Sequence, residues 1–139
     1  MAIVHQGSDW LAINKPAGVD MHSNNQPGLI AQLSEHWQRP LWPLHRLDSV
    51  TSGILLIGLS ADAARRFGQL FEQRQIEKYY LAVSTAKTKK KQGWVKGDMS
   101  KSRGGSWKLE RSQQNPAVNR FISQYDASKQ QSLFTLQPH

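Results

Sequence analysis

The residues best suited to chemistry lie together at positions 45–53, which read His-Arg-Leu-Asp-Ser-Val-Thr-Ser-Gly. Arg46 and Asp48 place a cation and a carboxylate on either side of Leu47. The apolar residues 54–57 follow at once and predict a buried strand. Burying charges beside a core strand costs free energy unless they are paired or take part in function. Charged residues in a sequence that otherwise predicts burial are typical of a functional site. We therefore expect Asp48 to be the chemical centre.

Two interpretations of Asp48 stay open from these residues alone. The adjacent Arg46 would favour an ionised carboxylate that is ready to act as a nucleophile. The alternative is an ion pair between Arg46 and Asp48 that only pins a turn. Other chemistries have less support, because the chain has no cysteine, no Gly-x-Ser-x-Gly elbow and no Walker or dinucleotide motif. The five histidines lack metal-ligand spacing, so no metal site is predicted.

Composition narrows the class of protein further. The 139 residues are enough for one domain, and no apolar run reaches the roughly 20 residues of a membrane span. The absence of cysteine suits a reducing cytoplasm, and we expect a cytosolic protein. Of the net charge of +8, residues 87–111 carry +7, from nine basic and two acidic residues. Such a segment favours contact with a polyanion, although a solvated lysine-rich loop is the simpler alternative.

The elements that must position these residues are predominantly strands. Hydrophobic periodicity predicts two helices, one that starts near Pro27 and ends before Pro40, and one at residues 61–74. The expected strands are residues 3–6, 10–13, 54–59, 76–83, 117–125 and 131–136, with a long basic hairpin whose arms are 93–97 and 106–109. Lys15 falls in a loop after the second strand, where it would face a phosphate or solvent. The order predicts an α+β fold with a largely antiparallel mixed sheet flanked by two helices.

Three motifs in register resemble the pseudouridine synthases of the RluA type. The block at 45–53 has the form His-Arg-Leu-Asp-x-x-Thr-Ser-Gly, and residues 14–18, Asn-Lys-Pro-Ala-Gly, resemble the upstream motif of that family. Lys78-x-Tyr80-x-Ala82, after Phe71, resembles the strand that supplies its active-site tyrosine. His45 favours the RluA type over the related RsuA type, which usually has glycine there.

The resemblance implies isomerisation of a uridine to pseudouridine in rRNA or tRNA, without a cofactor or metal. Asp48 would act at the ribose C1′ as nucleophile or base. Arg46 would help to extrude the nucleotide, and Tyr80 would stack on the uracil. The remaining residues expected to contact substrate or RNA are His45, Thr51, Lys78, Lys15, Lys89, Lys90, Lys91 and Arg103.

The resemblance also predicts what accompanies residues 1–139. We expect a single, partial catalytic domain without an S4-type RNA-binding domain. It would be incomplete at the C-terminus, because the expected Thr-Gly-Arg/Lys-x-His-Gln motif does not follow residue 136. A monomer is expected, with association through an uncovered sheet edge as a liability. The alternative function is a catalytically impaired remnant that binds RNA only through its basic segment.

Overall fold

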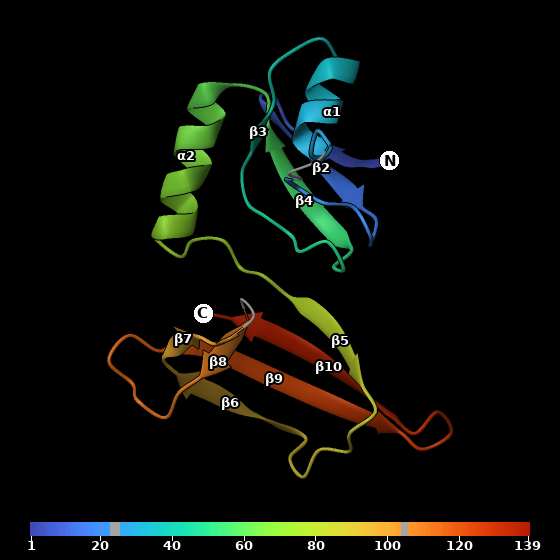
Figure 1. Ribbon diagram of the computed structural model, residues 1–139, viewed down its shortest axis with the longest axis vertical. Coiled ribbons are helices and arrows are strands. Elements are labelled where there is room, and N and C mark those ends of the chain that lie inside the picture. Colours follow the sequence, from blue (N-terminus) through green and yellow to red (C-terminus); the bar gives the residue numbers. More distant parts are fainter. Residues whose placement is uncertain (23–25, 104–105) are drawn as a thin grey trace. The chain divides into compact units, whose positions relative to one another are not determined.

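The computed structural model describes residues 1–22, 26–103 and 106–139. The chain forms two compact units, Met1–Gln73 and Arg74–His139. Every strand pairing within the described residues is antiparallel. The elements are labelled in Figure 1. No helix in the described ranges is long and apolar enough to cross a membrane.

The first unit is built on a four-stranded sheet in the order β1-β2-β4-β3. Its strands are β1 (Ile3–Gln6), β2 (Trp10–Lys15), β3 (Trp42–Pro43) and β4 (Gly53–Gly58). Residues opposite each other in a sheet share a face, so the pairs Leu11↔Ile57 and Ile13↔Leu55 point the same way. These four aliphatic side chains are buried and form the centre of the core.

The expectation that all of residues 54–57 are buried is wrong in one respect. Leu55 and Ile57 are completely buried, but Ile54 is 50% exposed. An antiparallel strand turns alternate side chains to opposite faces, and the other face is not covered at Ile54.

Two helices complete the first unit, as predicted. They are α1 (Leu29–His36) and α2 (Ala61–Glu72). Ser60 caps α2, because its Oγ accepts a hydrogen bond of 3.1 Å from the N–H of Ala63. Ala63 and Phe67 are buried, and the Phe67 ring lies 5.5 Å from that of Trp10 in β2. This amphipathic packing is what the spacing of apolar residues in α2 predicts.

The second unit holds a four-stranded sheet in the order β5-β10-β9-β6 and a separate two-stranded ribbon, β7-β8 (Figure 1). The sheet consists of β5 (Tyr80–Ser84), β6 (Gln92–Gly97), β9 (Ala117–Asp126) and β10 (Gln131–Pro138). The ribbon consists of β7 (Met99–Lys101) and β8 (Trp107–Leu109). The hairpin predicted from the last two strands of the chain is confirmed as β9 and β10.

Two expectations for this unit are corrected. The predicted arms of the basic hairpin do not pair with each other, because β6 pairs with β9 and β8 pairs with β7. The strand predicted at residues 76–83 begins only at Tyr80, where Leu136 of β10 becomes its partner. Residues 76–79 have strand-like composition, but among the described pairings the register with β10 does not extend beyond Tyr80.

The α+β class is confirmed, with antiparallel sheets and two helices in the part of the chain that the structure describes. The single flanked sheet of the prediction is replaced by two four-stranded sheets and a ribbon. The sequence pattern identifies strands, but it does not say which strands share a sheet.

Candidate active site

The block of residues 45–53 presents its charged side chains to solvent. Leu47 is buried at 8% exposure, whereas Arg46 and Asp48 on either side of it are exposed. The carbonyl oxygen of Asp48 accepts a hydrogen bond of 3.0 Å from the N–H of Thr51, which closes a four-residue turn. Aspartate is a favoured first residue of such turns. The carboxylate therefore stands at the start of a turn that the buried Leu47 anchors to the core.

This arrangement removes the conflict predicted from the sequence. Leu47 is buried while Arg46 and Asp48 on either side of it are exposed, so the two charged groups remain hydrated. The alternative of an Arg46–Asp48 ion pair is not supported, because none joins these two side chains in the described part of the chain. An exposed carboxylate on a fixed turn is accessible to a substrate.

Gly53 closes the block with a φ of 132°, a conformation that side chains with a Cβ atom rarely adopt. Gly18, in the upstream motif at residues 14–18, likewise has a positive φ of 82°. The N–H of Gly18 donates a hydrogen bond of 2.7 Å to the carbonyl oxygen of Ser49. The two motifs, separated in sequence, are therefore adjacent in the fold.

Lys15 also joins residues 14–18 to the block at 45–53. We expected it to face a phosphate or solvent, and it does neither. Its side chain is completely buried. The Nζ atom donates hydrogen bonds to the carbonyl oxygens of Val19 at 2.9 Å, Pro16 at 3.1 Å and Ser49 at 3.3 Å. Three acceptors satisfy the three donors of an ammonium group, which offsets the cost of burying it. The predicted contact between Lys15 and an RNA phosphate is therefore corrected to a structural role.

His45 is tied to the backbone of β4. Its Nε2 atom accepts a hydrogen bond of 3.1 Å from the N–H of Leu56, and its ring lies 5.6 Å from that of Phe71. An imidazole nitrogen can accept only when it carries no proton, so the neutral ring has its proton on Nδ1. His45 thus fixes the start of the block against the neighbouring strand.

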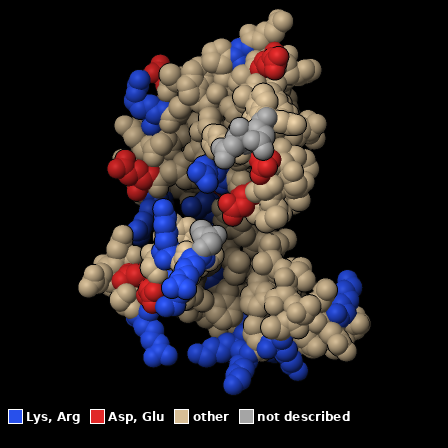
Figure 2. Space-filling view, viewed as in Figure 1, with Lys and Arg blue, Asp and Glu red and all other residues tan. Residues whose placement is uncertain are grey.

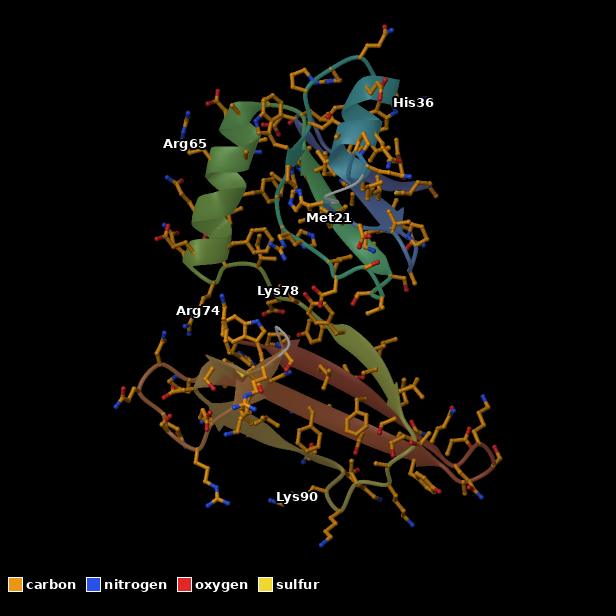
Figure 3. All side chains as sticks on the ribbon, viewed as in Figure 1. Met21, His36, Arg65, Arg74, Lys78 and Lys90 are labelled. Carbon is orange, nitrogen blue, oxygen red and sulfur yellow. The ribbon has the colours of Figure 1, made fainter. Side chains whose placement is uncertain are left out.

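Tyr80 and Lys78 belong to the second unit. Tyr80 is half-buried at the start of β5, opposite Leu136, and shares a sheet face with Phe134. Lys78, labelled in Figure 3, is half-buried and precedes the strand. The structure brings residues 14–18 and 45–53 together within the first unit, whereas Tyr80 and Lys78 lie in the other unit.

Positive charge is concentrated in the second unit, as Figure 2 shows by the density of blue side chains. Residues 74–139 contain thirteen Lys and Arg against four Asp and Glu, while residues 1–73 contain five against six. Lys89, Lys90, Lys91 and Arg103 are all exposed. Lys90 extends outward in Figure 3. The second unit therefore presents most of the cationic surface.

Buried serines hold the lysine loop, residues 87–91, in place. Ser123 donates from its N–H to the carbonyl oxygen of Lys91 at 2.6 Å and from its Oγ to that of Lys90 at 3.1 Å. Ser132, completely buried, donates to the carbonyl oxygen of Ala86 at 2.9 Å. Sequence reasoning missed both serines. The pattern that could have identified them is the alternation of side chains along β9 and β10. It places both serine hydroxyls on the face of the sheet that is buried at these positions.

Hydrogen bonds also lower the pKa of the carboxyl groups of Asp98 and Asp9, which lie outside the predicted site. Hydrogen bonds from the side chain of Ser112 and the N–H of Gln114 lower the pKa of Asp98. The bond from Gln114, at 3.0 Å, also ties the residues that follow β8 to the base of the β7-β8 ribbon. In the first unit, paired hydrogen bonds from the Arg66 guanidinium, at 2.8 and 3.1 Å, lower the pKa of Asp9.

Comparison with known proteins defines the class. Residues 9–139 match the family described as RNA pseudouridylate synthase, and the chain belongs to this family. The match spans both compact units and confirms the resemblance to RluA-type enzymes. Within the family, the chain is 43% identical over 138 residues to an uncharacterized RNA pseudouridine synthase of Haemophilus influenzae. That alignment covers 98% of this chain and 61% of the relative.

Two further comparisons agree. A tRNA pseudouridine synthase C of Haemophilus ducreyi is 38% identical over 86 residues, which are 58% of this chain and 35% of the relative. The structure of Human RNA Pseudouridylate Synthase Domain Containing 4 superimposes with a TM-score of 0.71 at 27% identity, covering 98% of this chain and 58% of that one. Where nearly all of this chain is aligned, it spans about three fifths of the length of the relative.

Proposed function

We propose that this protein isomerises a uridine to pseudouridine within an RNA, with Asp48 as the catalytic carboxylate. In this reaction the bond between N1 and C1′ breaks and a bond between C5 and C1′ forms. The C5 proton is lost and N1 gains one, so substrate and product are isomers and no oxidant is needed. The observation that carries the proposal is the exposed Asp48 carboxylate on a turn held by Leu47 and by the Ser49 carbonyl.

A role for each further residue follows from its motif position. Arg46, exposed beside Asp48, would occupy the space left by the extruded nucleotide, because chemistry on a stacked base requires its removal from the helix. Tyr80 would contact the uracil and assist removal of the C5 proton. His45 and Thr51 position the Asp48 turn, since their hydrogen bonds join it to β4 and close it.

The proposed substrate is a structured RNA, either tRNA or rRNA. Support comes from the excess of cations over carboxylates in the second unit and from the relatives whose names specify tRNA. Counterion release from RNA phosphates would supply much of the affinity. We further propose a monomeric protein of the cytosol in which residues 1–139 belong to one catalytic domain.

A second candidate is RNA binding without catalysis. One observation favours it: the cationic surface belongs mainly to the second unit, whereas Asp48 belongs to the first. Such a protein would bind RNA through Lys89, Lys90, Lys91 and Arg103 and release it unchanged.

The deciding experiment measures pseudouridine in tRNA and rRNA transcripts incubated with the full chain. We expect product with the wild type and a loss on the order of 10⁴-fold or more for Asp48→Asn, because the variant lacks the reacting carboxylate. The matched control is Asp62→Asn, which alters an exposed carboxylate paired with Arg65 in α2. Undiminished product from Asp48→Asn contradicts the mechanism. RNA binding without product from the wild type supports the second candidate.

A further inference from the structure

The β7-β8 ribbon has two chemically different faces. Lys101 lies opposite Trp107 and Met99 lies opposite Leu109, so these four side chains share one face. The three apolar ones are exposed, at 59% for Trp107, 45% for Leu109 and 43% for Met99. Large apolar side chains gathered on one exposed face indicate a surface that binds something.

The opposite face is polar and internally neutralised. Ser100 donates a hydrogen bond of 2.7 Å to Glu110, and the Lys108 ammonium lies 3.3 Å from the same carboxylate. The negative charge of Glu110 is therefore paired on the face opposite to that of Trp107. On the Trp107 face the charge comes from Lys101, whose Nζ lies 5.9 Å from the centre of the indole ring. Among the described residues, the apolar face thus carries a cation with no carboxylate paired to it.

The base of the ribbon is held in place although a two-stranded ribbon is marginally stable by itself. The Asp98 N–H donates to the carbonyl oxygen of Ser112 at 2.9 Å, and the Glu110 N–H donates to that of Asp98 at 2.8 Å. The Asp98 carboxylate accepts from the N–H groups of Gln114 and Asn115 at 3.0 and 2.8 Å. The Trp107 face is therefore presented in a defined orientation relative to the preceding strand.

We propose that the Trp107 face of the ribbon, formed by Met99, Lys101, Trp107 and Leu109, stacks on unpaired bases of the RNA. An exposed indole offers a flat surface to a base, and an adjacent lysine attracts the phosphate that follows it. Paired bases expose no such face, so the ribbon selects a loop or bulge over a continuous helix. Trp94 is less suited, because its ring already contacts that of His139 at 5.1 Å. The inference rests on the proposed function in that RNA is the partner.

The test compares the affinity of the full chain for three RNAs with the same number of phosphates. They are a stem with an unpaired loop, the same stem–loop with abasic loop nucleotides, and a continuous duplex. We expect Trp107→Ala to weaken binding of the first RNA roughly 5- to 150-fold and to leave the other two unchanged. Trp107→Phe keeps an aromatic ring and should retain most of the affinity. The matched control is Tyr125→Ala, an exposed ring with the Lys87 ammonium 5.0 Å from its centre.

An equal loss of affinity for all three RNAs, or no loss, overturns the stacking proposal. So does a Tyr125→Ala variant that loses loop affinity as strongly as Trp107→Ala. A change from dimer to monomer in Trp107→Ala without RNA would make the ribbon a protein interface instead. Pseudouridine is assayed separately on the loop RNA. If binding of the loop RNA depends on Trp107 but no pseudouridine forms, only the proposed catalysis is contradicted. If pseudouridine forms but binding does not depend on Trp107, only the stacking proposal is contradicted.

Discussion

The ammonium group of Lys15 and the carbonyl oxygen of Ser49 are joined by a hydrogen bond of 3.3 Å in the interior of the first unit. Ser49 directly follows Asp48, and the same carbonyl accepts from the N–H of Gly18. A buried cation at the end of β2 thereby holds the turn that carries the exposed carboxylate. The stability of this turn depends on a charge that never reaches the solvent.

Replacing Lys15 with Met should destabilise the protein by about 3 kcal/mol, because three carbonyl groups lose the fully buried ammonium that donates to them. Thermal or urea unfolding measures the loss. The control is Lys129→Met at an exposed lysine, for which we expect a change within about 0.5 kcal/mol. A Lys15→Met protein as stable as the wild type would show that the three hydrogen bonds contribute nothing net.

The Asp9–Arg66 pair should make the free energy of unfolding depend on pH in the acid range. The hydrogen bonds from Arg66 lower the pKa of Asp9 below its ordinary 3.8, so the folded state binds this proton less readily than the unfolded chain. The stabilisation is present above pH 3.8 and is lost as the pH falls through the lowered pKa. Asp9→Asn should therefore have a lower unfolding midpoint than the wild type near neutral pH, with a difference that shrinks below pH 3.8.

The measurement is a series of unfolding midpoints at decreasing pH for both proteins. Asp62→Asn serves as the control, because its ion pair with Arg65 is more exposed and contributes less. A difference between Asp9→Asn and the wild type that stays constant into strong acid would rule out the pair as its cause.

Ser123→Ala should weaken RNA binding without removing a charge. The Oγ of Ser123 holds the carbonyl of Lys90 and lies 2.9 Å from Oγ1 of Thr88. Its loss should cost about 1 kcal/mol of stability and leave the lysine loop less ordered. Hydrogen exchange of residues 87–91, together with RNA affinity, measures the effect. Ser128→Ala, in the exposed turn between β9 and β10, is the control and should leave the exchange of that loop unchanged.

Replacing Lys89, Lys90 and Lys91 together with Gln should reduce the salt dependence of RNA binding. Each lysine that contacts a phosphate contributes a slope of about one in a plot of log affinity against log salt concentration. We expect the slope to fall by roughly two to three, measured by titration at several salt concentrations. Arg65→Gln, on the exposed side of α2 in the first unit, should leave the slope unchanged. An unchanged slope in the triple variant would remove the lysine loop from the RNA surface.

Local sequence was sufficient for much of the fold. The spacing of apolar residues predicts α1 and α2, the second within two residues at each end, because the apolar residues of an amphipathic helix recur with the period of the helix itself. The hairpin of β9 and β10 follows from two strand-like runs around a turn. The motif at residues 45–53 and its upstream partner identify the family and the candidate carboxylate from residue types alone.

Tertiary structure decided what those residues can reach. Whether Lys15 faces solvent depends in part on its hydrogen bond to the carbonyl of Ser49, which is 34 positions away in the sequence. The residues around Lys15 cannot predict a contact with so distant a segment. The pairing of β6 with β9 instead of β8 is likewise a contact between separate segments. The exposure of Asp48 is likewise a tertiary outcome, because it depends on the packing that buries its neighbour Leu47 and leaves the carboxylate outside the core. Sequence supplied the carboxylate, and packing around Leu47 and Lys15 made it accessible.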